Sequence, residues 1–172
     1  IIATPNQLHV EQGLACVGLG LPVLVEKPIA PEVASARSLV EAAAEAKVPV
    51  LVGHHRRHNP LIAEARQRLL AGEIGDTVAV HGSFWLFKPD DYFAMDWRTQ
   101  PGAGPILINL IHDIDLLRHL VGEVAEVQAM TSNRTRGFAV EDTAVIMMRF
   151  ENGALGTFTV SDTIVAPWSW EL

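Results

Sequence analysis

The sequence predicts an α/β protein with two domains, because two patterns divide its 172 residues. In residues 1–53, short apolar runs of strand length alternate with segments of helical periodicity, which is the order of parallel βαβ units. In residues 54–172, several strand candidates flank one long amphipathic helix, as in an α+β layer. We therefore expect the C-terminal part of a Rossmann-like parallel sheet over residues 1–53. An α+β domain with a largely antiparallel open sheet should follow it.

Five elements are expected in the first domain. In chain order they are a strand end at 1–3, a helix at 7–19 capped by Asn6, a strand at 21–25, a helix at 31–47 that begins at Pro31, and a strand at 48–52. Asparagine is a favoured N-cap, and proline is a favoured first helical residue. About 50 residues are too few for a complete dinucleotide-binding domain with two halves.

The second domain should begin with a helix and end in a hairpin. In chain order we expect a helix at 60–70, a strand at 77–85, a polar aromatic loop at 88–104, a helix at 105–121 closed by Gly122, and strands at 124–132, 143–150 and 154–161. Asn152-Gly153, between the last two strands, is a strong hairpin signal. The chain opens in mid-strand without a methionine and closes at 168–172 in a strand-like pattern. We therefore expect a piece of a longer protein, truncated at both ends.

The composition narrows the class of partner. The formal net charge is −7, so nucleic-acid binding, which needs clustered positive charge, is not expected. No apolar run reaches the roughly 18 residues that a membrane span requires, and no signal-peptide pattern is present. The single cysteine, Cys16, cannot form an internal disulfide, which fits a cytoplasmic protein.

The tripeptide Glu26-Lys27-Pro28 follows the strand candidate at 21–25. A lysine at the carboxyl end of a buried parallel strand lies where α/β proteins bind ligands. The proline restricts Lys27 to extended backbone geometry. Taken alone, the pattern fits equally well a surface lysine that happens to precede a proline.

A second polar group, Thr4-Pro5-Asn6 with His9, follows the first strand. The free N–H groups and the positive dipole end of the next helix suit a nucleotide or a ribose at this place. The alternative is a plain asparagine cap with an exposed histidine.

A third group, from Gly53 to Pro60, holds His54, His55 and His58. Their spacing matches no zinc pattern, and the segment has no acidic residue, so no metal is expected. Polar and cationic side chains at a strand end suit hydrogen bonds to a hydroxylated ligand. A metal-dependent hydrolase that uses His54, His58 and His112 is the alternative.

His112 lies at the edge of the apolar stripe of the helix expected at 105–121. At about 100° per residue, Asn109 and Asp115 lie about 60° to either side of it. A histidine beside polar neighbours can act as a general base near neutral pH. A histidine that only bonds to a helix neighbour is the alternative.

Together these groups form an ordered set. The set is Thr4-Pro5-Asn6 with His9, then Glu26-Lys27-Pro28, Arg57-His58-Asn59-Pro60, Trp97-Arg98 and His112-Asp113-Ile114-Asp115. It resembles the Gfo/Idh/MocA oxidoreductases, which include glucose–fructose oxidoreductase and inositol dehydrogenase, over nearly the whole chain. The resemblance implies a Rossmann domain that binds NAD or NADP, followed by a domain whose large open sheet commonly forms oligomer contacts.

The resemblance also implies a role for each group. Lys27 is the catalytic lysine and His112 the catalytic histidine. The cofactor-binding residues are Thr4, Pro5, Asn6, His9, Glu26, Lys27, Trp97 and Arg98, and the substrate-binding residues are Lys27, Arg57, Asn109 and His112. The implied substrate is a polyol, a sugar or a cyclic diol. The implied macromolecular partner is another copy of the chain.

Oxidation of a secondary alcohol needs a base that takes the hydroxyl proton while hydride leaves for the nicotinamide. We expect His112 to be that base, and the Lys27 ammonium to stabilise the developing alkoxide. Many family members carry an aspartate one helical turn before the histidine, where this chain has Ile108. On a regular helix Asn109 lies about 100° away from that position, so the substrate contacts are expected to differ.

The glycine-rich phosphate-binding turn of a Rossmann domain does not occur in this sequence. We expect it upstream, and we expect the chain by itself to bind dinucleotide weakly. The alternative function is a non-catalytic oligomerisation module built on the same sheet.

Overall fold

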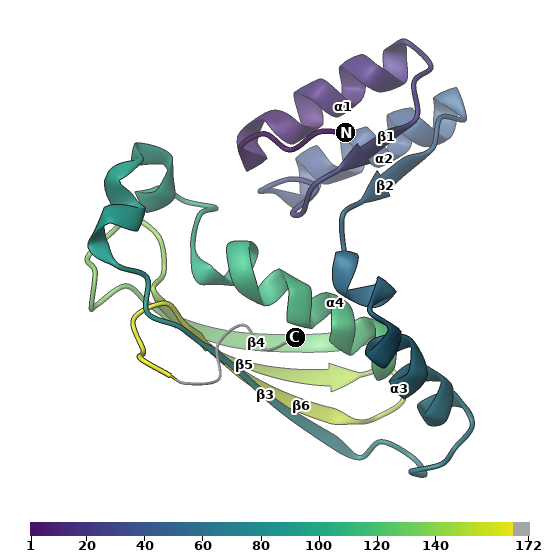
Figure 1. The fold of residues 1–172 in the computed structure, drawn as a ribbon, viewed down its shortest axis with the longest axis vertical. Helices are drawn as coiled ribbons and strands as arrows, with labels where there is room; N and C mark the ends of the chain where they lie inside the picture. The colour runs from purple at the N-terminus through teal and green to yellow at the C-terminus, as the bar shows by residue number, and fades with distance from the viewer. Residues whose placement is uncertain (167–172) are drawn as a thin grey trace. The chain divides into compact units, whose positions relative to one another are not determined.

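A computed structural model describes residues 1–166 and divides the chain into two compact units (Figure 1). Unit 1 comprises Ile1–His54, and unit 2 begins at His55. The strand-like pattern at 168–172 lies outside the described residues. Within residues 1–166, no helix is both long enough and apolar enough to cross a membrane.

Unit 1 is a small parallel sheet with two helices. Its elements are the 3₁₀ turn η1 (Asn6–Leu8), α1 (His9–Gly18), β1 (Val23–Val25), α2 (Val33–Ala46) and β2 (Val50–Val52). β1 and β2 are parallel, and the strand end expected at 1–3 is reduced to a parallel bridge between Ile2 and Val25. The predicted parallel sheet is confirmed. The helix α2 begins later than expected because Glu32 is extended, with φ −127° and ψ 144°.

One hydrophobic cluster joins these strands to both helices. Its buried members are Ile2, Val17, Val23, Val25, Leu39 and Ala43. The helices approach closely at Gly13 in α1, where a Cβ atom would lie 2.8 Å from Leu39 Cδ2 in α2. Because protein interiors are close-packed, this cluster fixes the strands whose ends carry the predicted site.

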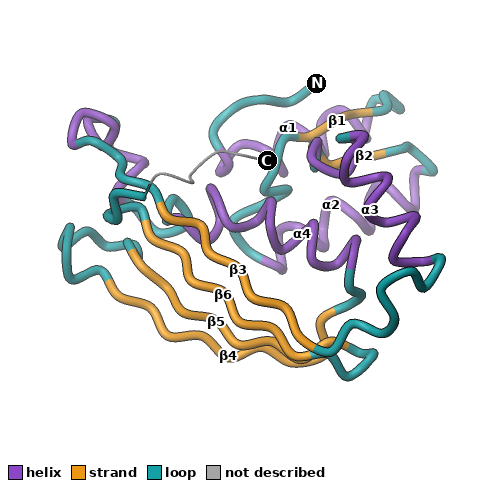
Figure 2. The backbone as a smooth tube through the Cα atoms, turned by 60° about the horizontal axis from the view of Figure 1, so that its bottom comes forward, coloured by secondary structure: helices purple, strands orange, loops and turns teal. Residues whose placement is uncertain are grey.

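Unit 2 is built on a four-stranded sheet (Figure 2). Its elements are η2 (His55–His58), α3 (Pro60–Leu70), β3 (Ala79–Trp85), η3 (Asp90–Ala94), η4 (Asp96–Thr99), the π turn η5 (Ile106–Leu110), α4 (Ile111–Leu120), β4 (Val124–Ser132), β5 (Thr143–Phe150) and β6 (Leu155–Ser161). The strand order is β3-β6-β5-β4. β3 runs parallel to β6, whereas the β6–β5 and β5–β4 pairs are antiparallel. The predicted largely antiparallel sheet is confirmed.

Local signals set the ends of several elements in unit 2. Asn59 caps α3, since its Oδ1 accepts the N–H of Leu61 at 2.9 Å, and Pro60 takes the first helical position. In the β5–β6 hairpin, Gly153 has φ +89°, a conformation that favours glycine. Gly122 follows α4 with φ +136°.

The helix α4 covers one face of the sheet, and the other face is open (Figures 1 and 2). Leu110, at the end of the π turn, is fully buried in the core between helix and sheet. Along β5, buried residues alternate with the exposed Val145, Met147 and Arg149, as the period of a half-covered strand requires.

The helix predicted at 105–121 is not regular. At Ile106–Leu110 it forms a π turn, in which the N–H of Ile111 bonds to the carbonyl of Ile106 five residues back. Such a turn places one extra residue in the helical ladder. The uniform 100° per residue that placed Asn109 relative to His112 is therefore wrong across this turn.

Candidate active site

The carboxyl ends of the strands in unit 1 lie at one edge of the sheet. The main-chain N–H of Glu26 bonds to the Ile2 carbonyl at 2.9 Å, and that of Gly53 bonds to the end of β1 at 2.8 Å. Because these strands are parallel neighbours, the segments 4–6 and 26–28 that follow them meet at this edge. It is the edge at which open α/β sheets bind ligands.

His9 is buried and links these two segments. It is 1% exposed, its Nδ1 lies 2.8 Å from the Pro28 carbonyl oxygen, and its Nε2 lies 2.8 Å from the Thr4 carbonyl oxygen. The Lys27–Pro28 peptide bond is cis. The alternative of an exposed histidine is therefore wrong. A contact between His9 and the cofactor stays a prediction, and the structure places the ring between the two segments.

Asn6 does not cap the first helix, so that prediction is wrong. The chain enters α1 through η1, Leu8 takes the N-cap position, and no side-chain cap bond forms at either element. Asn6 is 7% exposed, and its Nδ2 has no hydrogen-bond partner among the described residues. A buried donor without an acceptor costs free energy, so this amide fits a ligand that offers an acceptor.

Glu26 packs against the neighbouring strand end. A Cβ atom at Gly53 would lie 3.1 Å from Glu26 Oε1, so glycine leaves room for the carboxylate. Glu26 Oε2 also accepts the main-chain N–H of Lys27 at 3.3 Å. The carboxylate is thus held beside the backbone of the predicted catalytic lysine.

Two ion pairs in unit 2 fasten η2 to α4. Arg56 Nη1 lies 2.8 Å from Asp113 Oδ1, and the two side chains are 10% and 15% exposed. Arg57 forms a bidentate pair with Asp115, with Nε–Oδ2 and Nη2–Oδ1 distances of 2.7 Å. Bidentate and buried pairs are directional, so they hold the 55–58 turn in a defined place on the helix.

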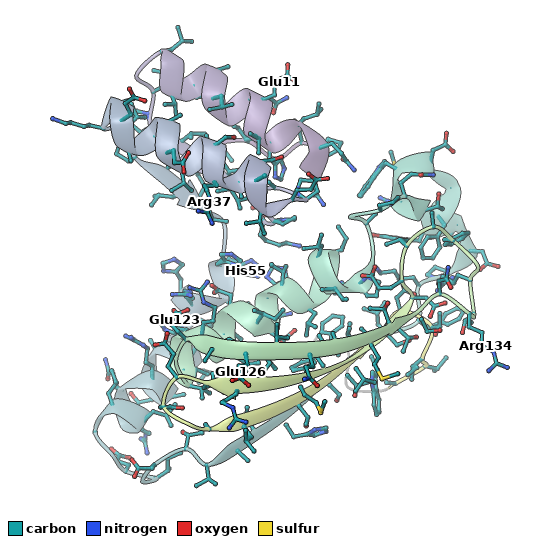
Figure 3. The ribbon with its side chains drawn as sticks, turned by 180° about the vertical axis from the view of Figure 1, so that it is seen from behind. Glu11, Arg37, His55, Glu123, Glu126 and Arg134 are labelled. Atoms are coloured by element: carbon teal, nitrogen blue, oxygen red, sulfur yellow. The ribbon has the colours of Figure 1, made fainter. Side chains whose placement is uncertain are left out.

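This arrangement places His55 against His112. The ring centroids are 5.0 Å apart, with an interplanar angle of 69°. His112 lies in the first turn of α4 and is partly buried, whereas His55, labelled in Figure 3, is exposed. The predicted catalytic histidine therefore has a neighbouring imidazole that the helix pattern did not indicate.

Burial and charge oppose each other at these pairs. Burial raises the pKa of Asp113, and the Arg56 guanidinium acts in the opposite direction.

Arg57 was predicted to bind substrate, and this stays a prediction. In the structure its guanidinium is engaged by Asp115, and its Nη1 lies 3.5 Å from His119 Nδ1.

Trp97 and Arg98 lie in η4, within the predicted loop. The Arg98 Cζ lies 4.1 Å from the centroid of the Tyr92 ring, and its Nη1 donates to the Tyr92 carbonyl at 2.7 Å. Burial raises the pKa of Tyr92, and Arg98 opposes that shift. In the described part of the chain, Arg98 Nε has no hydrogen-bond partner. The guanidinium is thus fixed and keeps one donor for a ligand.

Glu141 belongs to the surroundings of the site and was missed in the sequence. Its Oε1 accepts the N–H of Ile106 at 3.2 Å, which puts a carboxylate at the amino end of the helical segment that carries Asn109 and His112. A Cβ atom at Gly104 would overlap this carboxylate. The glycine just before the helix was the only local signal of such a close approach.

Asn109 lies in the π turn η5, and its side-chain oxygen is buried. It is 6% exposed, and its Oδ1 has no donor within residues 1–166. A buried amide oxygen in this position suits the hydroxyl group of a ligand.

The contact at Gly104 leads to a stability prediction. We expect Gly104→Ala to lower the free energy of unfolding by about 1–3 kcal/mol, because the new methyl group meets the Glu141 carboxylate. Gly18→Ala is the matched control. Apart from the adjacent backbone of its own helix, no atom of residues 1–166 lies within 4 Å of its added Cβ, and we expect a change of less than about 1 kcal/mol. Thermal unfolding of the full-length variants measures both, and equal midpoints would contradict a fixed Glu141.

Within residues 1–166, no group of three or more His, Cys, Asp or Glu side chains is arranged to hold a metal ion. The metal-dependent hydrolase built on His54, His58 and His112 gains no support from this arrangement.

The parallel sheet of unit 1 and the ligand-binding position of its strand ends are features of Rossmann-type domains, and comparison with known families identifies the family. Residues 1–54 match the oxidoreductase family with an NAD-binding Rossmann fold, and residues 62–172 match the GFO/IDH/MocA C-terminal domain. The chain therefore belongs to the Gfo/Idh/MocA family, which confirms the resemblance.

Several characterised proteins are similar to this chain. The 1,5-anhydro-D-fructose reductase of Ensifer adhaerens is 33% identical over 162 residues, which cover 91% of this chain and 48% of that protein. The WlbA dehydrogenase from Bordetella pertussis, solved in complex with NADH and UDP-GlcNAcA, superposes with a TM-score of 0.89 at 30% identity, over 94% of this chain and 51% of that one. A levoglucosan dehydrogenase complex with NADH and levoglucosan gives a TM-score of 0.86 at 29% identity, over 95% and 47%. The chain spans about half the length of these relatives.

Proposed function

We propose that the full-length protein is an NAD(P)-dependent dehydrogenase that transfers hydride between a nicotinamide cofactor and a polyol, a sugar or a cyclic diol. The observation that carries the proposal is the convergence of segments 4–6 and 26–28 at the carboxyl edge of a parallel sheet. At this edge the Asn6 amide is buried, and its Nδ2 finds no acceptor among residues 1–166. Family membership, and the NADH bound in the solved relatives, support the same reading.

The residues that we assign to the cofactor are those that the family resemblance implies. They are Thr4, Pro5, Asn6, His9, Glu26 and Lys27 in unit 1, and Trp97 and Arg98 in unit 2. Asn6 Nδ2 and Arg98 Nε are buried donors without a hydrogen-bond partner in the described part of the chain, and they suit the oxygen atoms of an amide, a ribose or a phosphate. The nicotinamide, when bound, supplies the acceptor or donor of hydride.

His112 and Lys27 would move the proton and stabilise the charge. His112 would take the proton of the substrate hydroxyl at a ring nitrogen, and a bound nicotinamide would supply the acceptor for the hydride of the carbon that bears this hydroxyl. As the proton leaves, negative charge grows on the substrate oxygen. The Lys27 ammonium is the group assigned to stabilise that charge.

The substrate class is inferred from the relatives and from the π turn. The similar proteins named above are a reductase of an anhydro sugar and a dehydrogenase of levoglucosan, and the third was solved with UDP-GlcNAcA. The resemblance implies an aspartate in many members at the position of Ile108. The buried Oδ1 of Asn109, which lacks a donor within residues 1–166, is the acceptor that we assign to a substrate hydroxyl.

A substrate panel tests this function. The full-length protein is incubated with inositols, anhydro sugars, aldoses and sugar-nucleotide uronates, each with NAD and with NADP. We expect reduction of the nicotinamide with at least one carbohydrate class and with one of the two cofactors preferred. If the protein binds a cofactor tightly but reduces it with no member of the panel, the proposed function is wrong.

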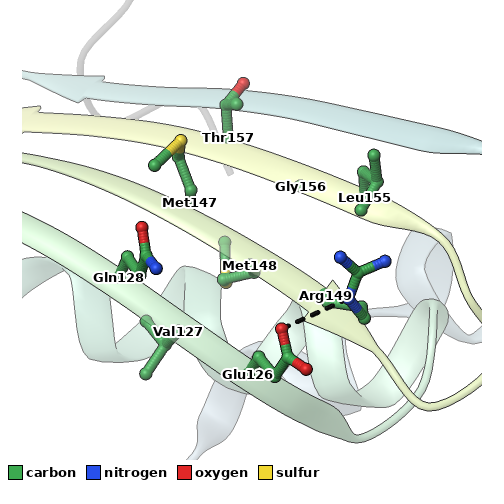
Figure 4. Close-up of a pocket in the computed structure, with 9 residues that line it drawn as sticks. All are labelled: Glu126, Val127, Gln128, Met147, Met148, Arg149, Leu155, Gly156 and Thr157. Carbon is green, nitrogen blue, oxygen red and sulfur yellow. Dashed lines mark hydrogen bonds and ion pairs between the residues drawn. The ribbon is translucent and has the colours of Figure 1, made fainter.

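The second candidate function, the oligomerisation module, is favoured by the open face of the sheet in unit 2. On this face Met130, Val145, Met147 and Leu155 are 80%, 50%, 54% and 51% exposed. A groove across β4, β5 and β6 is lined by residues 126–128, 147–149 and 155–157 (Figure 4). Glu126 and Arg149 place charges of both signs at this groove, 3.3 Å apart. An apolar face that carries both charges suits a second copy of the same chain.

A charge on this face should disrupt the assembly. We expect full-length wild-type protein to be a dimer or larger, and Met147→Glu to be mainly monomeric, because two copies would bury unpaired carboxylates against each other. Light scattering after gel filtration measures the masses. Leu70→Glu, on an exposed position of α3, is the control and should leave the mass unchanged. A monomeric wild type would remove this candidate.

A further inference from the structure

A buried cluster of charged side chains lies at the end of the sheet in unit 2, and none of the roles above uses it. The side chains of Lys88, Arg136 and Asp162 are 6%, 8% and 3% exposed. Lys88 Nζ lies 3.4 Å from Asp162 Oδ2, and burial lowers the pKa of this lysine against the opposing charge of Asp162. Burying ions costs free energy unless they are well paired, so the geometry of the cluster is tightly determined.

Arg136 is the centre of this cluster. Its Nε donates to Asp162 Oδ1 at 2.9 Å, and its Nη2 donates at 2.7 Å both to the Asp162 carbonyl and to the carbonyl of Lys88. The backbone of Arg136 is held as well, since its N–H donates to Asp142 Oδ2 at 3.0 Å. Arg136 therefore joins three segments: its own loop, the end of β6, and the first residue of the 88–104 loop.

A series of ring contacts continues from Arg136 to Arg98. The Arg136 Cζ lies 4.2 Å from the centroid of Phe93, and the Phe93 and Tyr92 rings are 5.0 Å apart. On the far side, the Arg98 Cζ lies 4.1 Å from the Tyr92 ring. Phe138, from the loop of Arg136, also packs on Phe93 at 5.1 Å. Cation–π and aromatic contacts of this kind prefer defined geometries.

We propose that Arg136 is a positioning residue that fixes the loop bearing Trp97 and Arg98 for ligand binding. It acts through the Lys88 carbonyl and through the Phe93 and Tyr92 rings, and it does not contact the ligand. The part of the inference that concerns the ligand rests on the proposed function, because Arg98 is assigned to the cofactor there. The fixed position of the loop does not depend on that assignment.

The first test measures the loop without any ligand. Amide hydrogen exchange is compared in full-length wild type and Arg136→Gln. We expect exchange in residues 89–100 to become at least about tenfold faster, since the bond from Arg136 Nη2 to the Lys88 carbonyl is lost, while β4 and β5 keep their protection. Arg136→Lys, which keeps the charge but not the planar fork, should show the same change and serves if Arg136→Gln does not fold. Unchanged exchange in residues 89–100 would overturn the proposal.

The second test is a double-mutant cycle with Arg98→Ala. We expect Arg136→Gln to raise the Kd of the cofactor about tenfold with a smaller change in kcat, and to add little in the background of Arg98→Ala, because both changes remove the same contact. Additive effects would show that Arg136 acts elsewhere. If Arg98→Ala itself leaves cofactor binding unchanged, the assignment of Arg98 in the proposed function fails, and hydrogen exchange alone decides the role of Arg136.

Lys88→Met is the matched control. It removes the buried ammonium, together with its contact to the Tyr92 ring at 4.9 Å, but keeps the main-chain carbonyl that Arg136 bonds. Replacing a buried charge by an apolar side chain of similar shape is often tolerated. We expect exchange in residues 89–100 and the Kd of the cofactor to stay within about twofold of wild type. A loss as large as that of Arg136→Gln would mean that the charge of the cluster, and not the fork of Arg136, holds the loop.

Discussion

Replacing Lys27 with alanine in the full-length protein is expected to lower kcat about 10³-fold, with the protein still folded. The reason is that the ammonium is assigned to stabilise charge that exists only as the substrate hydroxyl loses its proton. A group of this kind contributes to the transition state more than to substrate binding. The KM of the substrate should therefore change much less than kcat.

The control is Lys47→Asn, which removes an exposed lysine from the same unit. Lys47 ends α2 with φ +55°, a conformation that asparagine tolerates, so neither stability nor kcat should change appreciably. Steady-state kinetics and thermal unfolding are measured for both variants. Turnover by folded Lys27→Ala at the wild-type rate would return the lysine to the surface role that its local sequence also fits.

Replacing His112 with asparagine is expected to lower kcat about 10²- to 10⁴-fold, the range for loss of a general base. The pH profile should also change. In the wild type, kcat/KM should fall on the acidic side as the base becomes protonated. In His112→Asn this fall should be absent, because the remaining activity no longer depends on that group.

His58→Asn is the control for this variant, since His58 is an exposed histidine of η2 in the same unit. We expect its kcat and its pH profile to match those of the wild type. If His58→Asn loses as much activity as His112→Asn, and added chelator abolishes the rest, the metal-dependent alternative replaces the dehydrogenase.

The elements that the sequence predicted well are those whose ends depend on local chemistry. The helix at 60–70 has its expected bounds because Asn59 and Pro60 form a cap and a first turn by themselves. The β5–β6 hairpin follows from Asn152-Gly153, because only a few residues tolerate its turn conformation. The strand-edge position of Glu26-Lys27-Pro28 was likewise predictable, since the βαβ order alone places strand ends at one edge.

The features that the sequence could not give depend on contacts across the fold. The bonds from Arg56 to Asp113 and from Arg57 to Asp115 join segments more than 50 residues apart. On a helix, residues two apart do not face each other. No local pattern therefore predicts that Asp113 and Asp115 both pair with the turn at 55–58. The π turn is similar, because a run of apolar residues such as Ile106–Leu110 reads as an ordinary helix.

The buried position of Asn6 likewise could not be predicted from its local sequence. An asparagine before a helical pattern is usually a cap. Here Pro5 takes the N-cap position of a 3₁₀ turn, and Asn6 is the first, buried residue of that turn. The result is a buried amide whose Nδ2 has no acceptor in the part of the chain that the structure describes. This departure from the local rule lies where the proposed function needs a ligand contact, as expected of functional positions.

Isotope transfer distinguishes hydride transfer to the cofactor from release of the same hydrogen to solvent. A substrate from the panel is deuterated at the carbon that is oxidised, and the full-length protein is given one equivalent of the preferred cofactor. If the protein transfers hydride, the deuterium appears in the reduced nicotinamide, and Lys27→Ala and His112→Asn slow this transfer. Release of the deuterium to solvent, with none found in the cofactor, would contradict hydride transfer by this protein.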